Sequence, residues 1–230
     1  MLDTRAAWRA GVVAAVPIMI GYLPIAITFG VIAQQTGVTP WETTFMSMFV
    51  FAGASQFMAV QMGAAGAGVL EIVIATFVLN FRHFVMSLSL MERLPSISRR
   101  WKWLLSSGIT DETFAVASFE ARKRELHRFQ LAGLILGAYV SWVVGSLGGH
   151  WMAQTIPPAL SESMSIALYA MFIGLLIPAV RGAWRAAAVA VTSMLLCAAF
   201  QAVLDSGWAI VMATVIAAGL GSFWMKGEGD

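Results

Sequence analysis

Residues 72–91 read IVIATFVLNFRHFVMSLSLM, an apolar run of membrane-spanning length that carries Asn80, Arg82 and His83 near its centre. A lipid-facing helix does not need these side chains, because an arginine at the centre of a span costs at least about 2.5 to 3.5 kcal/mol on insertion scales. Such an arginine faces protein, a partner charge or water instead. The stretch therefore predicts a membrane-spanning segment with a functional site inside it.

Two backbone conformations of this stretch are compatible with its sequence. A regular helix places Asn80 and His83 on one face with Thr76 and Ser87, and directs Arg82 to different surroundings. A helix unwound near Asn80 brings Arg82 and His83 to one cavity, as discontinuous helices do in transporters. We favour the unwound form. The alternative to a functional role is a structural ion pair of Arg82 inside a helix bundle.

The composition of the whole chain is that of a membrane protein. Of the 230 residues 59% are hydrophobic and 11% are charged, and the mean hydropathy is +0.79. Further uncharged runs of about spanning length occur at residues 11–33, 43–70, 129–154, 163–180, 186–204 and 206–225. The alternating pattern of barrel strands is missing from the sequence. We predict an all-α polytopic integral membrane protein with about seven or eight hydrophobic segments, forming a single transmembrane domain over residues 1–230.

The basic residues constrain how these segments cross the membrane. All but one of the 14 Lys and Arg residues lie in five places: Arg5 and Arg9; Arg93, Arg99, Arg100 and Lys102; Arg122, Lys123, Arg124 and Arg128; Arg181 and Arg185; and Lys226. The positive-inside rule places these clusters, and with them the N-terminus, in the cytoplasm. Despite the sequence pI of about 9.0, this distribution indicates lipid headgroups rather than nucleic acid as the partner.

Full crossing by every segment violates that rule, so some segments are predicted to be re-entrant or broken. One of the first three does not cross as a simple helix. Residues 103–119 form a second such segment, which is short and carries Asp111 and Glu112 at its centre. Irregular backbone at membrane depth needs protein or water around it, so two such segments predict an aqueous site between them.

Asp111 and Glu112 are the acidic partners that we expect for Arg82 and His83. If the fold brings the four side chains together, their charges balance. Histidine titrates near neutral pH, and burial raises the pKa of a carboxyl group toward that range, so the cluster can carry a proton. A permanent salt bridge is the alternative. His83, Asp111 and Glu112 are therefore the candidates for proton coupling.

The second segment contains a motif that suits either a substrate pocket or a tight helix crossing. Residues 51–57 read FAGASQF. Gly53 is small enough for close backbone approach. Ser55 and Gln56 supply hydrogen-bonding groups, and Phe51 and Phe57 supply apolar walls.

Two further features concern packing and bending. In the first segment Pro17 and Pro24 free backbone carbonyls, which indicates either kinked packing or a hinge beside a binding site. Gly53 in the second segment is the third candidate for a hinge or kink. In the fifth segment small residues recur every fourth position and form a ridge that another helix can approach closely: Gly133, Gly137, Ser141, Gly145 and Gly149. Packing within the chain and docking of a separate membrane subunit are both compatible with this ridge.

Other classes of protein find little support in the sequence. A hydrolytic triad of Ser55 or Ser107 with His83 and Asp111 can be drawn, but these residue types are too common for it to be specific. The sequence lacks the phosphate-binding loop of ATPases, and its one cysteine, Cys197, lies in an apolar run. The methionines of the second segment have no Cys or His among them. We predict no enzymatic activity, no metal and no cofactor.

Four motifs occur in order along the first half of the chain: GYLP at residues 21–24, FAGASQF at 51–57, NFRH at 80–83 and TDE at 110–112. On these motifs the chain resembles the AzlC family of branched-chain amino acid permeases, most closely over residues 9–119. Phe81 stands where that family usually has leucine. The resemblance implies export of valine, leucine, isoleucine or similar amino acids across the inner membrane. It also implies a small AzlD-like membrane subunit, for which the glycine ridge is the expected seat.

A branched-chain amino acid is a zwitterion with an apolar tail, and the candidate residues match its three parts. We expect its carboxylate at Arg82 or at exposed backbone N–H groups, its ammonium at Asp111 or Glu112, and its tail against Phe51 and Phe57. The predicted substrate-binding set is completed by Asn80, Ser55 and Gln56. His83 is the first candidate for coupling transport to protons. A channel-like pore, or a transporter of another small zwitterion or organic anion, is the alternative.

Overall fold

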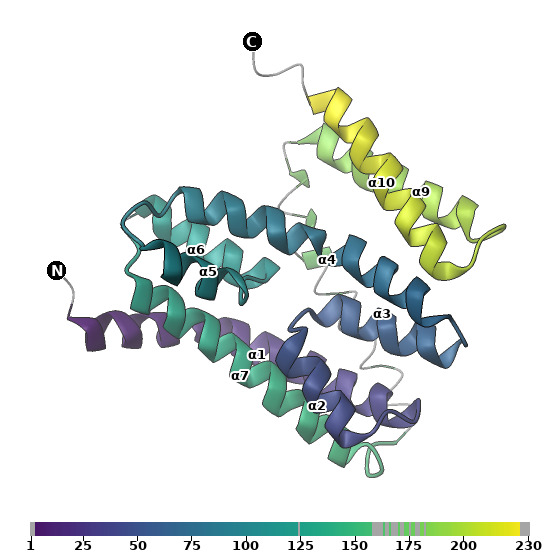
Figure 1. The fold of residues 1–230 in the computed structure, drawn as a ribbon, viewed down its shortest axis with the longest axis horizontal. Helices are drawn as coiled ribbons and strands as arrows, with labels where there is room; N and C mark the ends of the chain where they lie inside the picture. Colours follow the sequence, from purple (N-terminus) through teal and green to yellow (C-terminus); the bar gives the residue numbers. More distant parts are fainter. Residues whose placement is uncertain are drawn as a thin grey trace. The chain divides into compact units, whose positions relative to one another are not determined.

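A computed structural model describes residues 3–123, 125–157 and 183–225, with scattered residues between 163 and 181. Every regular element in these residues is a helix (Figure 1), which confirms the all-α prediction. The chain forms two compact units, unit 1 from Met1–Val60 and Asn80–Ser165, and unit 2 from Gln61–Leu79 and Ile166–Asp230. Most of the predicted segment at residues 163–180 lies outside the described residues.

Two long helices, α1 (Thr4–Gln35) and α7 (Arg128–Met152), pack side by side in unit 1 and run in the same direction (Figure 1). Both are long and apolar enough to cross a membrane. Pro17 and Pro24 lie inside α1 without ending it, and the Thr28 hydroxyl donates a hydrogen bond of 2.8 Å to the Pro24 carbonyl. A hinge role for the two prolines stays a prediction.

The contacts between α1 and α7 are reciprocal. A Cβ atom added at Gly11 would overlap the carbonyl of Gln130, and one added at Gly133 would approach the Trp8 carbonyl to 2.6 Å. Each glycine thus faces the carbonyl three residues before the other glycine. The same relation recurs near the opposite end, where Gly30 faces Ser146 and Gly149 faces Ile27. The two backbones are therefore in direct contact near both ends of the pair.

This contact decides between the two interpretations of the glycine ridge. Gly133, Gly137, Gly145 and Gly149 all face α1, and an added Cβ at Gly137 or Gly145 would lie 2.7 Å from an alanine Cβ of that helix. The ridge is occupied by packing within the chain. A separate subunit needs another surface, because α1 covers the one on which we expected it.

The second apolar segment is interrupted, as we predicted for one of the first three. It forms α2 (Pro40–Phe49) and α3 (Gly53–Ala64), and Phe51 between them has a positive φ of 40°. Thr39 and Glu42 form a capping box at the start of α2. The close approach predicted at Gly53 is to an aromatic ring, since an added Cβ would lie 2.6 Å from Trp142.

The helix α4 (Val69–Glu92) runs without a break through Asn80. The prediction that it unwinds there is wrong. The stretch contains neither proline nor glycine, and a continuous helix satisfies its own backbone hydrogen bonds in an apolar environment. α4 is the third helix of the described chain that is long and apolar enough to span a membrane.

The short segment at residues 103–119 is broken, as predicted, and its re-entry into the membrane stays a prediction. Its residues belong to α5 (Arg99–Ser106), α6 (Asp111–Lys123) and the turn between them. Thr110 and Thr113 cap α6 mutually: the Thr110 N–H donates to the Thr113 hydroxyl at 2.8 Å, and the Thr113 N–H donates to the Thr110 hydroxyl at 3.3 Å. The acidic side chains that follow Thr110 are therefore not needed as caps.

In unit 2 the apolar helices α9 (Trp184–Phe200) and α10 (Ser206–Met225) pack against each other across a short connection (Figure 1). An added Cβ at Gly221 of α10 would lie 3.0 Å from the Val189 side chain of α9. These helices match the segments predicted at residues 186–204 and 206–225.

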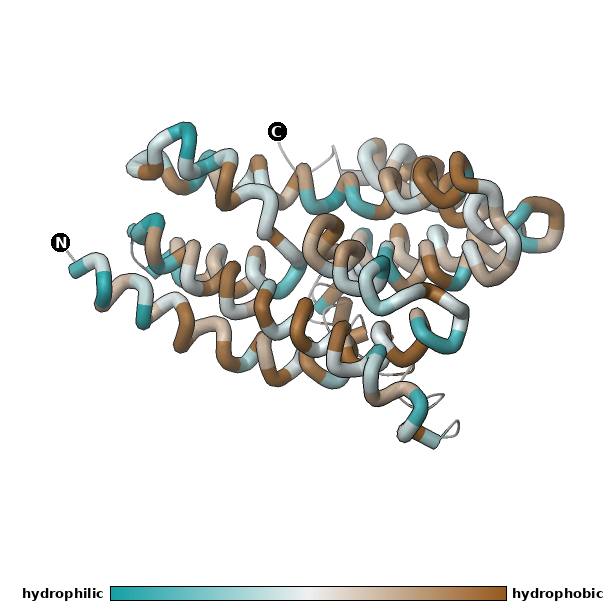
Figure 2. Tube along the Cα trace, turned by 60° about the horizontal axis from the view of Figure 1, so that its bottom comes forward, coloured by the Kyte–Doolittle hydropathy of each residue, from teal (hydrophilic) through white to brown (hydrophobic). Residues whose placement is uncertain are grey.

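Hydrophobic residues recur along the lengths of the helices, while hydrophilic residues are concentrated toward turns and helix ends (Figure 2). Ile20 of α1, Phe84 of α4 and Val144 of α7 are among the exposed large hydrophobic residues. Soluble proteins rarely expose apolar surface on this scale. The chain is thus built for contact with lipid.

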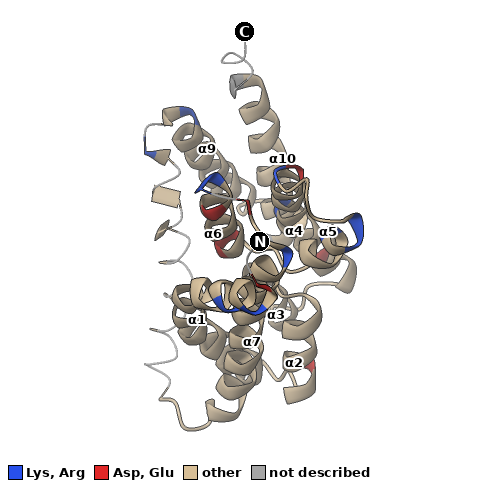
Figure 3. Cartoon of the chain, turned by 90° about the vertical axis from the view of Figure 1, so that its left-hand side faces the viewer, with Lys and Arg blue, Asp and Glu red and all other residues tan. Residues whose placement is uncertain are grey.

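Apart from Arg82, the basic residues of unit 1 gather at the end where α1 and α7 begin, and this end faces the viewer in Figure 3. Arg5 and Arg9 lie in the first turns of α1. Arg128 starts α7 and lies over the Trp101 ring of the basic helix α5, 5.6 Å from its centroid. This gathering agrees with the single basic side predicted from the sequence; the side of the membrane that it faces stays a prediction.

Candidate functional site

An ion pair joins the centre of α4 to the start of α6. The Arg82 guanidinium lies 3.2 Å from an Asp111 carboxylate oxygen, and the His83 Nε2 lies 3.9 Å from the same oxygen. The Arg82 and Asp111 side chains are 32% and 25% exposed, so the pair is partly buried and still accessible. The structure thus brings together three of the four predicted charged or titratable residues.

Arg82 and His83 both reach Asp111 from an unbroken helix because they occupy consecutive positions on it. Side chains at consecutive helical positions diverge by about 100°, and Asp111 lies where both Arg82 and His83 reach it. The expectation that a straight α4 separates these two side chains into different surroundings is wrong. It used helical spacing alone and left out the reach of the arginine side chain.

Glu112 turns away from this ion pair and meets α1. Its Oε2 accepts a hydrogen bond from the Tyr22 hydroxyl, which also lies 2.7 Å from the Thr110 hydroxyl. Tyr22 is 4% exposed. The other carboxylate oxygen of Glu112, Oε1, is buried and has no hydrogen-bond partner in the described part of the chain. The site therefore contains a buried acceptor with unused capacity.

Tyr22 belongs to the site although we did not predict it as a site residue. A phenol within an apolar span needs a hydrogen-bond partner, and this requirement was the available signal. Its ring also packs edge-on against Trp142 and Phe51, with centroid separations of 5.4 and 6.4 Å. Phe51 in turn meets Tyr139 at 5.2 Å. Glu112 thus approaches an aromatic cluster.

The two phenylalanines predicted to form the apolar walls of a substrate pocket lie in different places. Phe51 reaches the aromatic cluster through Tyr22, whereas Phe57 packs on Phe29 with a centroid separation of 5.5 Å. Both predicted phenylalanines are buried. Phe51 is the one whose ring touches Tyr22, the residue hydrogen-bonded to Glu112.

Ser55 and Asn80 connect the interrupted segment to α4. The Ser55 hydroxyl lies 2.8 Å from the Asn80 side-chain oxygen, and Ser55 itself is fully buried. Asn80 precedes the ion pair by less than one helical turn. These two predicted residues therefore hold α3 against the part of α4 that carries Arg82 and His83.

Gln56 is fixed by its neighbours on both sides. Its amide nitrogen donates to the Ser47 hydroxyl at 3.0 Å, and its amide oxygen accepts from the Trp142 indole at 2.9 Å. Ser47 donates in turn to Ser146 at 2.8 Å. These bonds link α2, α3 and α7, and they assign Gln56 to the frame of the site.

A second polar contact between α2 and α7 involves a histidine. His150 lies in the last turn of α7, and its Nδ1 is 3.1 Å from the Thr43 hydroxyl. Ser47, Ser146 and Thr43 were not predicted as polar contacts. In the described residues no group of three or more potential metal-ligating side chains occurs.

The AzlC protein family model matches residues 17–156, which is more than half of the chain. The chain belongs to the AzlC family. The resemblance seen in the four motifs is thereby confirmed. The match contains Tyr22, Arg82, Asp111 and Trp142, so the candidate site lies wholly inside the AzlC region.

Several membrane proteins are similar to this AzlC chain. An uncharacterized membrane protein of Archaeoglobus fulgidus is 34% identical over 82% of this chain and 83% of its own length. The inner membrane protein YgaZ of Escherichia coli is 30% identical over 70% and 68%, respectively. The branched-chain amino acid transport protein AzlC of Bacillus subtilis is 25% identical over 48% and 43%. No solved structure matches the chain.

Proposed function

We propose that this AzlC-family chain is a secondary transporter that exports branched-chain or similar small amino acids across the inner membrane. The observation that carries the proposal is the partly exposed ion pair of Arg82 and Asp111, with His83 beside it, on a helix of membrane-spanning length. Charged residues inside a span commonly mark substrate or ion pathways. The name of the B. subtilis relative supports the choice of substrate.

The three parts of a zwitterionic substrate find matching groups around this pair. Arg82 binds the carboxylate, since a guanidinium recognises carboxylates through paired hydrogen bonds. The ammonium is accepted by Asp111 or by Glu112, whose buried Oε1 lacks a donor among the described residues. Phe51, which touches Tyr22, is the first candidate for contact with the apolar tail.

Proton coupling is proposed to use the shared carboxylate. Asp111 faces both Arg82 and His83. When His83 takes up a proton, its charged imidazole competes with the Arg82 guanidinium for the same Asp111 oxygen. Weakening the Arg82–Asp111 pair in this way frees the Arg82 guanidinium for the substrate carboxylate. Protonation and substrate binding are thereby linked through one atom.

A small AzlD-like membrane subunit is proposed as the partner. The proposal is supported by the family membership. Because α1 occupies the glycine ridge, the subunit is expected on one of the exposed apolar faces of the chain. The same faces accept lipid when the chain is alone.

The test is efflux of labelled valine from proteoliposomes that contain the chain, with and without the small subunit. The pH gradient is imposed or collapsed, and unlabelled leucine, other zwitterions and organic anions are supplied as competitors. We expect gradient-dependent efflux of valine that leucine competes for and that Arg82→Ala removes. A flux that ignores the gradient and the Arg82 substitution favours a channel-like pore. If none of these solutes is transported under any condition, the transporter proposal is overturned.

A further inference from the structure

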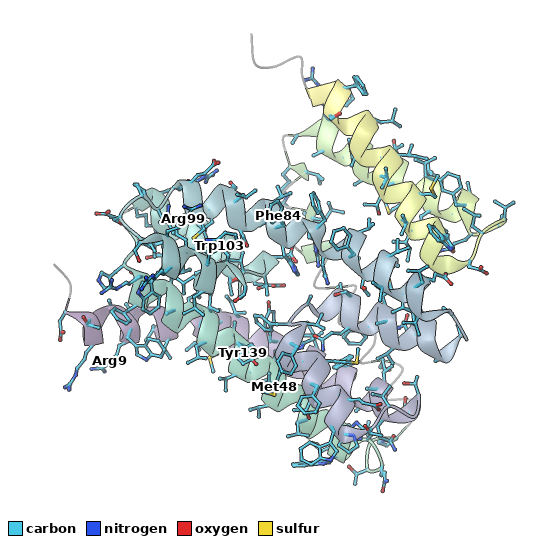
Figure 4. All side chains as sticks on the ribbon, viewed as in Figure 1. Arg9, Met48, Phe84, Arg99, Trp103 and Tyr139 are labelled. Atoms are coloured by element: carbon cyan, nitrogen blue, oxygen red, sulfur yellow. The ribbon has the colours of Figure 1, made fainter. Side chains whose placement is uncertain are left out.

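A cavity of about 220 Å³ lies between α4 and α5, near the basic end of unit 1. Its apolar lining comes from Phe84, Leu88 and Met91 of α4 and from Trp103 of α5. Arg99 and Lys102 of α5 line the same cavity. Figure 4 shows Phe84, Trp103 and Arg99 around this part of the structure. This cavity thus combines an apolar lining with two cationic side chains, and none of its residues belongs to the proposed transport site.

Two hydrogen bonds hold the walls of this cavity together. The Ser87 hydroxyl donates to the Ser106 carbonyl at 3.1 Å, and the Lys102 ammonium donates to the Met91 carbonyl at 2.7 Å. The lysine thereby satisfies a carbonyl in the last turn of α4, where positive charge is favourable. An ammonium has three N–H donors, so Lys102 keeps donors for an anion. The two bonds thus connect α4 and α5 beside the cavity.

The sequence of α5 places it at the surface of a bilayer. It reads RRWKWLLS over Arg99–Ser106, combining basic residues with two tryptophans and two leucines. Helices of this composition lie in the interface, with basic side chains toward anionic headgroups and aromatic rings toward the acyl chains. Trp103 is 72% exposed. Its ring therefore borders both the cavity and the surroundings of the chain.

We infer that this cavity binds an anionic phospholipid. The headgroup phosphate lies against Arg99 and Lys102, and one acyl chain occupies the space between Phe84, Leu88 and Trp103. The charge of the lining selects an anionic headgroup over a zwitterionic one, and guanidinium and ammonium groups both bind phosphate strongly. A lipid bound here bridges α4, which carries Arg82, and the α5–α6 segment, which carries Asp111.

The test uses the full chain in phosphatidylcholine vesicles into which phosphatidylglycerol with brominated acyl chains is titrated. Bromine quenches tryptophan fluorescence on contact, and Trp103→Phe identifies the contribution of the cavity. We expect Trp103 to be half-quenched at a mole fraction at least about fivefold below that needed with brominated phosphatidylcholine, the ratio that one basic contact supplies. Equal quenching by the two lipids overturns the inference.

Neighbouring arginines provide a matched pair of variants. Arg99 lines the cavity and Arg100 does not, although both are exposed and lie on the same helix. Arg99→Gln is expected to lower the preference for phosphatidylglycerol about fivefold, and Arg100→Gln less than about twofold. If both variants lose the preference for phosphatidylglycerol equally, the preference comes from diffuse surface charge and the proposed lipid site is overturned.

A third variant tests the apolar part with the charges retained. Ser106→Phe fills the cavity and is expected to remove the preference for phosphatidylglycerol in the quenching of Trp103, while the exposed part of the ring is still quenched equally by both lipids. Circular dichroism and gel filtration check that the variant folds, and Ser106→Leu replaces it if it does not. An unchanged preference for phosphatidylglycerol in a folded variant excludes the cavity as the site of the acyl chain.

Discussion

Arg82 at the centre of α4 and Asp111 at the first turn of α6 approach to 3.2 Å, and this contact joins the two most unusual parts of the sequence. One is a charge inside a membrane-spanning helix, and the other is an acidic helix start flanked by basic clusters. Each is unfavourable in an apolar environment by itself. Together they form a neutral pair whose side chains are still accessible, which is what a site for a zwitterion requires.

The first prediction concerns this pair. Arg82→Ala and Asp111→Asn are each expected to reduce valine efflux at least about tenfold, and to lower thermal stability by about 1 to 3 kcal/mol. The double exchange Arg82→Asp with Asp111→Arg restores the pairing with reversed polarity. We expect it to recover stability without recovering transport. Recovery of transport as well shows that the pair is structural.

The second prediction concerns Tyr22. Tyr22→Phe keeps the ring contacts with Trp142 and removes the hydroxyl that Glu112 accepts from, which is expected to cost about 1 to 3 kcal/mol of stability and to reduce efflux. Tyr139→Phe is the control, because its hydroxyl donates to the Met48 carbonyl at 3.1 Å and does not contact the acidic residues; both residues are labelled in Figure 4. Similar effects in both variants contradict a special role for Tyr22. Thermal unfolding in detergent and efflux are the two measurements.

The third prediction concerns proton coupling through His83. His83→Gln keeps a hydrogen-bonding side chain but cannot take up a charge near neutral pH. Efflux driven by the valine gradient alone is expected to continue, while its acceleration by an imposed proton gradient disappears. Proton-driven efflux at the original rate assigns the coupling to another residue.

The fourth prediction uses two adjacent glycines of α7. Gly149→Ala places a Cβ against the backbone of Ile27 and is expected to destabilise the α1–α7 pair by about 2 kcal/mol or more. Gly148→Ala meets nothing within 4 Å and is expected to be neutral or slightly stabilising. Thermal unfolding compares the two variants directly. Equal behaviour contradicts the close packing of α1 and α7.

The sequence predicted the elements well where a signal was local. The apolar runs gave the long helices, and the conflict between charge distribution and simple threading correctly required broken segments. The convergence of Arg82, His83 and Asp111 was expected because an arginine in lipid needs a partner. None of these inferences required knowledge of how distant helices pack.

Most of the errors lay where distant elements meet. The turning of Glu112 to Tyr22 depends on where α6 starts relative to α1, which no spacing within one segment reveals. The glycine ridge was recognised, but a small-residue face is equally suited to a helix of the same chain and to another subunit. The bonds of Gln56 to Ser47 and Trp142 join three separate helices and have no local signature.

The reciprocal glycine contacts of α1 and α7 have a mechanical consequence. With carbonyl oxygens set against the facing backbone near both ends, neither helix can slide along or roll over the other without a collision. We expect the two helices to move together as one rigid pair. In the proposed transport cycle, opening of the ion pair to one side of the membrane and then to the other is therefore expected to come from movement of α4, α5 and α6 against this helix pair, through side-chain contacts such as the one between Tyr22 and Glu112.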